Sequence, residues 1–330
     1  MNRVVVVGII FLFVASSVIP IYGFNIEQLN ILSSDGNTLY VGGSGEGNYT
    51  KIQDAIDNAS NGDTVFVYSG TYYENVDLML KSISLIGEEK NTTVIDAKGI
   101  GTAISIDRFN YLSTIRGFTI QNSGSEEFAS GIFISEVHGV IITNNIVVAN
   151  NIGIYLYNTR DCQIRNNNII RNKGGIFGTG ASIKQVYYCY NTTLTGNYIS
   201  DNDFGIAYAF NRNGMISGNI ITNNGIGFVY YICNYNMICT GNNISNNNVG
   251  LNSIHGLTVV QNNFINNTQH VKLRGFHSFF MNIYNSTWKR NYWGKPRKLP
   301  YPIPVRIGFH GLIPWFPQFD WNPAQEPYDI

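Results

Sequence analysis

One phrase recurs between Ile141 and Val271, and it constrains the fold more than any other feature of the sequence. The phrase is Asn, any residue, an apolar residue, two further residues, Asn, two further residues, Gly and an apolar residue. Its leading asparagines are Asn145, Asn167, Asn197, Asn219, Asn242 and Asn262, and the sixth copy has His270 where Gly is expected. The steps between them are 22, 30, 22, 23 and 20 residues, and such a period indicates a stack of repeated units.

Each period contains three short apolar clusters separated by Asn or Gly, without the i, i+3, i+4 spacing of a helix. The first cluster includes Ile164, Leu194, Ile216 and Val259, each three residues before a leading Asn, with Ile238 one residue further back. Three β-segments per period, on coils ~4.8 Å apart, predict an all-β fold. We expect a single-stranded, right-handed parallel β-helix, a solenoid with about 22 residues per coil.

The polar residues between the clusters are expected at the corners of the coil. Asn tolerates the left-handed backbone region, and its side-chain amide both donates and accepts hydrogen bonds. Stacked asparagines are therefore expected to form an internal ladder along the solenoid. Gly is expected at the second corner because it has no Cβ.

The first residues are typical of an export signal. Arg3 supplies a positive start, residues 4–14 are apolar, and residues 20–23 provide a breaker followed by a small residue. We expect a signal peptide over 1–23, a lead-in with a capping helix over 24–62, the β-helix over 63–287 and a Trp- and Pro-rich cap or tail over 288–330. An uncleaved membrane anchor is the alternative for the first segment, because its apolar stretch approaches the ~20 residues that span a bilayer.

Charge and composition narrow the classes of binding partner that the protein can have. Lys plus Arg number 21 and Asp plus Glu number 21, so the sequence offers no overall electrostatic attraction to nucleic acid. Only 13% of residues are charged, which fits one elongated solenoid. We expect a monomer in a secreted, cell-surface or periplasm-like compartment, with membrane contact only through an uncleaved N-terminal segment.

The segment before the repeats predicts a short helix that closes the N-terminal end of the stack. Its apolar residues between Ile52 and Ala59 share one helical face, and Thr50 is the expected N-cap with Gln53 three residues on. A helix in this place hides the edge of the first coil.

This segment also carries a resemblance. With Gly62-Asp-Thr-Val, Gly70-Thr-Tyr-Tyr-Glu and Lys81-Ser-Ile-Ser-Leu-Ile-Gly, it resembles the cap and first coils of pectin-esterase-like proteins of the pectin-lyase-like superfold. With the later repeats, residues 39–293 are similar to secreted prokaryotic β-helix proteins with carbohydrate-binding and sugar-hydrolase-type repeats. That group includes relatives of the periplasmic nitrous-oxide-reductase accessory protein. The resemblance implies the fold and a glycan partner, but a shared fold does not carry chemistry.

The sequence favours a protein without catalytic activity. The esterase family's catalytic Asp has no counterpart, since residues 174–178 read Gly-Gly-Ile-Phe-Gly, and the polygalacturonase motifs are missing from the sequence. Glycoside hydrolysis normally needs two carboxyl groups, whereas three acids lie between Glu136 and Asp320. A polysaccharide lyase or glycoside hydrolase with atypical residues stays open as an alternative. Its weak candidates are Asp161, Asp201, Asp203, Arg160 and Arg212.

Two of these acids have a structural interpretation. Asp201 and Asp203 stand at the same offsets before their Gly as Arg171 and Lys173 stand before theirs. Adjacent coils would then hold the pairs 201/171 and 203/173 within salt-bridge reach. We expect a surface ion-pair ladder worth ~0–1 kcal/mol per pair, with calcium binding or catalysis as the alternative.

No metal site or cofactor is predicted, and calcium is an alternative without further support. Soft or imidazole ligands that would suit copper occur without tight spacing, namely Cys233, Met237, Cys239, His255, His270 and His277. A Cys inside a β-helix is typically a small core residue. Cys189 and Cys233 fall on coils two steps apart, which is too far for a disulfide.

The residues that follow the repeat glycines predict a binding surface. The first residue after each Gly is apolar and expected inside, so alternation sends the second and fourth outward. The outward residues are Tyr155, Phe177, Ala207, Val229, Tyr157, Thr179, Ala209 and Tyr231. A solvent-facing strip this apolar is expected to be covered.

Two occupants of the strip are open. The Trp-rich tail docks on it, or the strip forms a groove with Tyr187, Tyr188 and Tyr190 in which sugar rings stack on aromatic rings. We favour the tail as cover and the groove as the functional hypothesis. The function expected is a secreted or cell-surface β-helix that binds, or processes, a polysaccharide or cell-envelope glycan. A structural or accessory envelope protein without a glycan ligand is the alternative.

Overall fold

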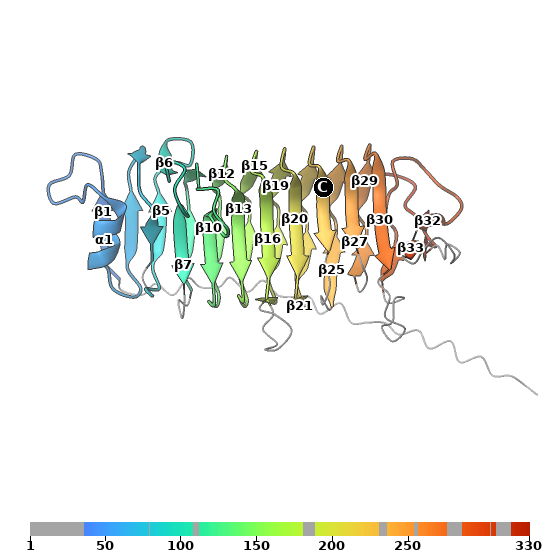
Figure 1. Ribbon diagram of the computed structural model, residues 1–330, viewed down its shortest axis with the longest axis horizontal. Coiled ribbons are helices and arrows are strands. Elements are labelled where there is room, and N and C mark those ends of the chain that lie inside the picture. The colour runs from blue at the N-terminus through green and yellow to red at the C-terminus, as the bar shows by residue number, and fades with distance from the viewer. Residues whose placement is uncertain are drawn as a thin grey trace, which may run out of the picture. The chain divides into compact units, whose positions relative to one another are not determined.

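The computed structural model describes residues 36–78, 80–107, 112–180, 189–230, 236–253, 257–275, 286–303, 305–307 and 318–330. The expected signal peptide over 1–23 lies outside the described residues. The described chain forms a right-handed parallel β-helix built from three long parallel sheets, as the repeat predicts (Figure 1).

Sheet A has eleven strands and carries the first apolar cluster of each coil. They are β1 (Thr38–Val41), β2 (Thr64–Val67), β5 (Ser84–Gly87), β8 (Thr114–Arg116), β11 (Ile141–Thr143), β14 (Gln163–Arg165), β18 (Thr193–Thr195), β22 (Met215–Ser217), β25 (Met237–Thr240), β28 (Leu257–Val260) and β31 (Thr287–Lys289).

Sheet B has nine strands and carries the second cluster. They are β3 (Gly70–Tyr72), β6 (Thr93–Asp96), β9 (Thr119–Gln121), β12 (Ile146–Val148), β15 (Asn168–Ile170), β19 (Tyr198–Ser200), β23 (Ile220–Thr222), β26 (Asn243–Ser245) and β29 (Asn263–Ile265).

Sheet C has ten strands and carries the third cluster. They are β4 (Val76–Asp77), β7 (Ile104–Asp107), β10 (Ser130–Ser135), β13 (Ile152–Tyr157), β16 (Gly174–Thr179), β20 (Phe204–Ala209), β24 (Ile226–Tyr230), β27 (Val249–Ser253), β30 (Gln269–Gly275) and β33 (Val305–Ile307). Two further pairs are β17 (Cys189–Tyr190) with β21 (Asn211–Arg212), and β32 (Tyr301–Ile303) with β34 (Gln318–Asp320).

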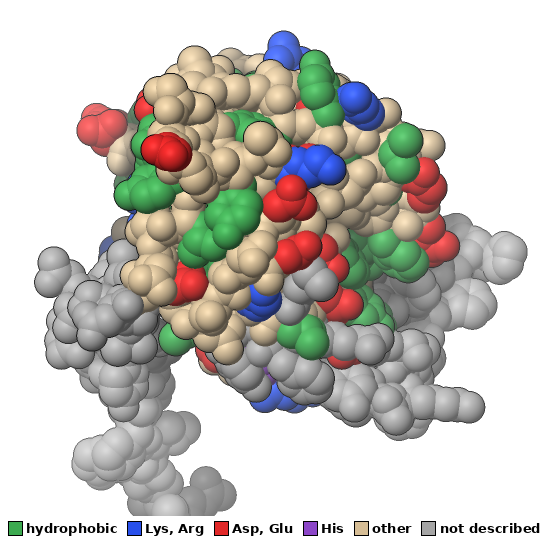
Figure 2. All heavy atoms as spheres, turned by 90° about the vertical axis from the view of Figure 1, so that its left-hand side faces the viewer, with side chains coloured by type: hydrophobic (Ala, Val, Ile, Leu, Met, Phe, Trp, Pro, Cys, Tyr) green, Lys and Arg blue, Asp and Glu red, His purple; other side chains and the backbone are tan. Residues whose placement is uncertain are grey.

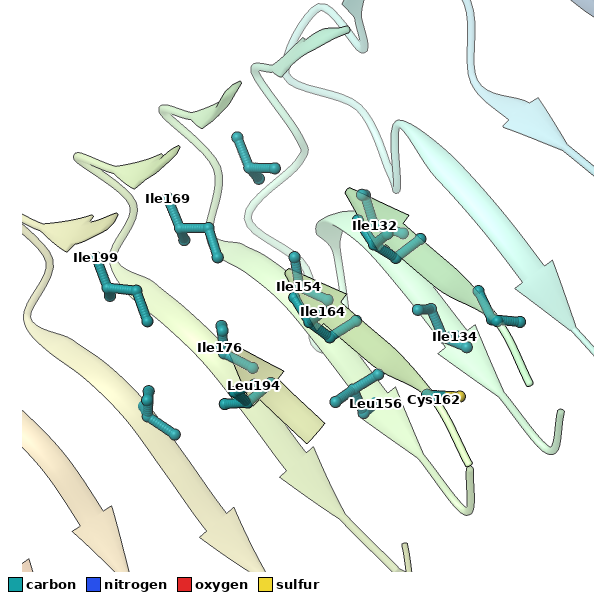
Figure 3. Packing of buried hydrophobic residues seen from close by; sticks show 14 of the residues in the cluster. Ile132, Ile134, Ile154, Leu156, Cys162, Ile164, Ile169, Ile176, Leu194 and Ile199 are labelled. Atoms are coloured by element: carbon teal, nitrogen blue, oxygen red, sulfur yellow. The ribbon is translucent and has the colours of Figure 1, made fainter. Parts of the chain in front are cut away.

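Each coil runs through sheet A, a first corner, sheet B, a second corner, sheet C and a third corner. The core is made of aliphatic stacks, because the same position on successive coils carries the same kind of side chain (Figure 3). In sheet A, Ile142, Ile164 and Leu194 pair in register and are fully buried. Each such side chain contributes ~1.5–3 kcal/mol when it leaves water.

Sheet A departs from the expected pattern at one coil. Cys239, not Ile238, pairs with Ile216 and Val259, and it fills the buried position. Ile238 points outward and is 42% exposed. A thiol has replaced an aliphatic side chain in this stack, which fits the prediction that cysteines here are small core residues.

The first corner contains a ladder of buried amides. Its members are Asn145, Asn167, Asn197, Asn219, Asn242, Asn262 and Asn291. The Asn167 Nδ2 donates to Asn197 Oδ1 at 3.1 Å and to the Ile142 carbonyl at 2.9 Å, and the Asn167 backbone N–H donates to the same Oδ1 at 3.1 Å. Each amide therefore joins three coils, and it satisfies backbone groups that a corner would otherwise leave unpaired.

A second ladder of buried amides, with the same hydrogen-bond chemistry, lies at the second corner. Its members are Asn150, Asn172, Asn202, Asn224, Asn247 and Asn267, each at most 8% exposed. Asn202 Nδ2, for example, donates to Asn224 Oδ1 at 2.9 Å and to the Ser200 carbonyl at 2.9 Å. The predicted ladder is therefore confirmed, and it exists twice.

The corner residues themselves differ from the prediction. The left-handed backbone belongs to the residue before each ladder Asn, as at Asn166 (φ 57°) and Asp201 (φ 59°). The repeat glycines lie inside the strands of sheet C instead of at the second corner. A Cβ on Gly205 would stand 2.6 Å from the Gly227 carbonyl oxygen, so Gly is needed for the close approach of neighbouring coils.

Helix α1 (Ile52–Asn58) closes the N-terminal end, with Ile52, Ala55 and Ile56 buried. The expected cap at Thr50 is wrong, since Lys51 is the N-cap residue and makes no side-chain capping bond. Glu74 takes this role from the following coil, accepting the Ile52 and Gln53 backbone N–H groups at 3.0 Å each. Figure 2 looks onto this end, where carboxylates, a few basic side chains and separate hydrophobic patches lie among polar atoms.

The C-terminal segment first extends the stack and then caps it. Strand β31 adds a coil beyond the expected boundary at 287, and Trp288 pairs with Val259. Asp320 then takes the place of the next ladder Asn, because its carboxylate accepts the Asn291 N–H at 2.8 Å and Asn291 Nδ2 at 3.1 Å. Trp293 stacks between Phe264 and Tyr301 at centroid distances of 4.6 and 4.1 Å.

The last residues run back over the outside of the final coils. Tyr328 exchanges two hydrogen bonds with the side-chain amide of Asn263, at 2.8 and 2.9 Å. Aromatic stacking and the buried Asp320 hold the described part of the tail at the C-terminal end of the stack. The prediction that the tail covers the outward strip of sheet C stays a prediction, because residues 308–317 lie outside the described residues.

The described cysteines are buried thiols. Cys162, Cys189 and Cys239 are free and almost completely enclosed. Cys189 is unbridged, as predicted, and Cys233 lies outside the described residues. Burial raises the pKa of Cys162 to about 12 and that of Cys239 to about 12. These thiols therefore stay protonated at neutral pH.

We expect the Asn247→Ala variant to lose about 2–4 kcal/mol of unfolding free energy, because the Asn224 N–H and the Ile221 carbonyl lose their partner inside the protein. Asn248→Ala is the matched control, since its side chain is exposed and its backbone N–H keeps the Asn224 carbonyl. Urea unfolding followed by circular dichroism measures both. Equal midpoints for the two variants would contradict the ladder's role.

Stability is expected to fall as pH rises above about 9. The folded state raises the thiol pKa above its ordinary value of 9.0, so this contribution is complete below pH 9 and is lost toward pH 12. Cys239→Val removes one such group and matches its neighbours Ile216 and Val259. Unfolding free energy measured from pH 8 to 11 should then fall less steeply, by up to ~1.4 kcal/mol per pH unit. The same slope in both proteins would refute the thiol contribution.

Candidate functional site

The outer face of sheet C carries a continuous row of apolar side chains. Phe133, Tyr155, Phe177, Ala207 and Val229 pair in register on five successive coils. The residues just before them in the strands point inward and are fully buried, namely Ile132, Ile154, Ile176, Ile206 and Phe228. The predicted alternation of inward and outward positions is confirmed.

Aromatic rings from neighbouring coils contact one another along this row. We call Phe128, Phe133, Tyr155, Phe177 and Phe204 the aromatic strip. The Tyr155 ring lies 5.6 Å from Phe128 in a stacked arrangement, 5.3 Å from Phe133 and 5.1 Å from Phe177. Phe177 lies 6.4 Å from Phe204. Such contacts fix the rings and present their edges and faces as one surface.

The strip is only partly open to solvent. Tyr155, Ala207 and Val229 are only 2%, 2% and 4% exposed, whereas Phe128 is 51% exposed. Phe133, Phe177 and Phe204 are partly exposed. Burial raises the pKa of the Tyr155 phenol, so this group stays neutral. The solvent-accessible rings are therefore those around Tyr155, and they pack against the buried Tyr155 ring.

Beside the strip, the third corner carries a second row. We call His138, Arg160, Tyr190 and Arg212 the corner ladder, since isolated bridges and the β17–β21 pair connect them in this order on successive coils. The Arg160 guanidinium lies 5.3 Å from the centre of the Tyr190 ring, and the Arg212 guanidinium lies 5.9 Å from it. Arg212 Nη1 also donates to Tyr190 Oη at 3.4 Å.

The structure thus brings together Arg160, Tyr190 and Arg212, which the sequence assigns to two separate candidate sites. Arg160 and Arg212 were weak catalytic candidates, and Tyr190 was a sugar-stacking candidate. Tyr157, another stacking candidate, pairs with Ser135 and Thr179 at the end of sheet C, between the strip and the corner ladder. Tyr187, Tyr188 and Tyr231 lie outside the described residues.

The three candidate acids lie at two different corners of the coil. Asp161 lies at the third corner, where its Oδ1 accepts Asn191 Nδ2 at 2.9 Å. Asp201 and Asp203 lie at the second corner, where the Ser200 hydroxyl donates to Asp201. A hydrolase needs both carboxyl groups beside one glycosidic bond, and Asp161 lies at a different corner from Asp201 and Asp203.

The predicted ion-pair ladder has the right register but lacks the ion pairs. Asp203 N–H donates to the Lys173 carbonyl at 3.0 Å, and Arg171 N–H donates to the Ser200 carbonyl at 3.1 Å. The side chains of these residues nevertheless form no salt bridge within the described part of the chain. Exposed partners of this kind gain little by pairing, because water solvates each charge well.

Some site residues escaped the sequence analysis. Phe133 follows Gly131-Ile132, which is the Gly-apolar pair 22 residues before Gly153. Extending the repeat by one period would have found it, although the leading Asn is missing there. Phe128 and Phe204 lie outside the counted positions, and no pattern in the sequence marks them. His138 stands seven residues after Gly131, as Arg160 and Arg212 stand after Gly153 and Gly205, so the extended repeat would have found it as well.

The sulfur and imidazole donors of the described chain are dispersed. No group of three His, Cys, Asp or Glu residues gathers in a metal-binding arrangement among the described residues. The Met237 sulfur accepts the Gly214 N–H at 3.1 Å, and the Cys239 thiol lies against the amides of Asn242 and Asn262. His270 packs among the aromatic rings of the C-terminal cap, where burial and nearby Arg297 lower its pKa.

Helix α1 spans seven residues, and no helix in the described ranges is long and apolar enough to cross a bilayer.

Solved structures share this architecture. An alginate lyase from Paenibacillus sp. str. FPU-7 superposes with a TM-score of 0.52 at 12% identity, covering 88% of this chain and 98% of the lyase. PfbA, a surface adhesin of Streptococcus pneumoniae, gives a TM-score of 0.50 at 13% identity, with 78% of each chain covered. The catalytic domain of a GH87 α-1,3-glucanase gives 0.52 at 11% identity, covering 78% and 58%. These likenesses show the fold alone, and a comparison with curated protein sequences gives no match.

A family described as periplasmic copper-binding protein (NosD) matches residues 56–189 and 184–298. Copper favours a compact set of thiolate, thioether or imidazole ligands. In the parts of the chain that the structure describes, the sulfur donors lie in the solenoid core with protonated thiols and existing hydrogen bonds, so they do not fit such a site. No copper chemistry is therefore assigned to them.

The family match nevertheless covers most of the solenoid. Its two segments together span residues 56–298, from the capping helix to the last coil. That is well over half of the chain, and the chain belongs to the NosD family of periplasmic β-helix proteins.

Proposed function

We propose that this protein binds a polysaccharide along the outer face of sheet C. The observation that carries the proposal is the aromatic strip, in which one ring from each of several successive coils contacts the next. Coils repeat every ~4.8 Å, so the strip offers a repeating surface to a ligand that is itself a chain of repeating units. Aromatic faces bind the apolar faces of sugar rings while the sugar hydroxyls remain in water.

The fold relatives support this class of ligand. The alginate lyase and the α-1,3-glucanase, which was solved with tetrasaccharides, are β-helix proteins that act on polysaccharides. At 11–12% identity they transfer no residue to this chain, so the proposal depends on its own rings. The periplasmic description of the family and the apolar start of the sequence support an exported location, in a periplasm-like compartment or on the cell surface.

Binding without cleavage fits the arrangement of the charged groups. Asp161 lies at the third corner, and Asp201 and Asp203 lie at the second. Asp161 is therefore separated from the other two acids, whereas a hydrolase holds its acid and its nucleophile or base beside one glycosidic bond. A binding protein needs only complementary shape, apolar contact and a few hydrogen bonds.

The double variant Phe133→Ala with Phe177→Ala should weaken binding of a polysaccharide probe by about tenfold or more, which corresponds to ~1.4 kcal/mol. Alginate, polygalacturonate and a neutral β-glucan serve as probes in isothermal titration calorimetry. Tyr198→Ala is the matched control, because Tyr198 is a 40% exposed ring on sheet B, outside the strip.

Melting temperatures verify that the double variant is folded. Unchanged affinity in a folded double variant, or an equal loss in the Tyr198→Ala control, would overturn the proposal. The same samples are assayed for new reducing or unsaturated sugar ends. Cleavage that survives in the double variant would place the activity elsewhere on the protein.

A further inference from the structure

The corner ladder holds two guanidinium groups at a fixed separation. Arg160 comes from the coil before Tyr190, and Arg212 comes from the coil after it. Both approach the Tyr190 ring, at 5.3 and 5.9 Å from its centre. Two coil steps separate the arginine backbones, which amounts to about 10 Å.

Tyr190 acts on the arginines in this arrangement, and its ring is not an open platform for a sugar. A guanidinium attracted to a ring face loses side-chain freedom before any ligand arrives. The bond from Arg212 Nη1 to Tyr190 Oη fixes the second arginine further. Tyr190 thus acts as a positioning residue for Arg160 and Arg212.

The corner ladder itself carries positive charge. His138 continues it on the preceding coil, and neither His138 nor the other three members is acidic. Two carboxylates lie nearby at the third corner, namely Asp161, whose Oδ1 accepts Asn191 Nδ2, and the exposed Glu136. Arg160 is exposed and Arg212 is half-buried, so guanidinium groups are the charged groups that the ladder presents beside Tyr190.

We propose that the corner ladder selects polysaccharides that carry carboxylates, of the uronic-acid type, over neutral ones. A guanidinium binds a carboxylate through two parallel N–H···O bonds, which a neutral hydroxyl cannot match. Two arginines at a fixed spacing read carboxylates that recur along one glycan chain, while the adjoining aromatic strip contacts the sugar rings. This inference depends on the proposed function and names the ligand class for the same surface.

The test compares one polymer in two charge states. Polygalacturonate and its fully methyl-esterified form share a backbone, and only the first carries free carboxylates. We expect the wild-type protein to bind the free acid at least about tenfold more tightly. Its affinity for the acid should also fall as salt is raised, because part of the contact is between partly exposed charges.

Arg160→Gln and Arg212→Gln should each lower the ratio of acid to ester affinity, and the double variant should bring it close to one. Arg165→Gln is the matched control, since Arg165 is an exposed arginine on sheet A. Tyr190→Phe keeps the ring and should retain most of the ratio, whereas Tyr190→Ala should lose it. Melting temperatures distinguish a lost contact from a misfolded corner.

Two outcomes separate the inference from the proposed function, and a third overturns both. If acid and ester bind equally well, the glycan proposal stands and the carboxylate inference fails. If inorganic polyphosphate binds as tightly as polygalacturonate at equal salt, the corner is an unselective anion surface and the inference also fails. If no polysaccharide binds, both fail.

Discussion

The buried side-chain amide is the interaction on which this solenoid depends. A coil that turns sharply leaves backbone N–H and carbonyl groups inside the protein, where water cannot reach them. From Asn145 at the first corner and Asn150 at the second, one Asn per coil accepts a backbone N–H from the coil before it and donates to a carbonyl of that coil. Because the same amide also bonds its counterpart on the next coil, register and corner geometry are fixed together. The ladder ends at Asp320, which supplies acceptors and needs no further Asn.

This constraint explains what the sequence predicts well. The period, the three sheets and the inward stacks follow from the leading asparagines and the apolar clusters, because the ladder admits little else at its positions. The prediction from the sequence placed the turn at the wrong residue. Asn166 and Asp201 take the left-handed backbone one residue before the ladder amide, and a period alone does not separate adjacent residues. Gly205 looked like a turn residue, but it is required by close packing between coils, which depends on the neighbouring coil.

The candidate site shows a different limit. Arg160 and Arg212 stand at the same offset after a repeat Gly, so their common corner was visible in the sequence. The position of Tyr190 at this corner was not visible in the sequence. The step from Asn167 to Asn197 is 30 residues, and the extra length shifts the offset of Tyr190 from its repeat Gly. Only the pairing of Tyr190 with Arg160 and Arg212 places it between them. Insertions break sequence register while they preserve spatial register, and functional residues in long coils are lost for that reason.

The location of the candidate site follows from the same ladder. From Asn145 to Asn291 and from Asn150 to Asn267 the two corners are committed to amides, and a side chain without an amide between these ends would leave backbone groups unsatisfied on two coils. The third corner lacks this commitment at the corner ladder, where His138, Arg160, Tyr190 and Arg212 occupy equivalent positions on successive coils. On the outward face of sheet C, a side chain is limited only by the size of its neighbours. The paired row from Phe133 through Phe177 to Val229 illustrates this. Substitutions on this side of the coil therefore leave the amide ladders intact. A ligand surface can change there without altering the ladders that hold the coils together.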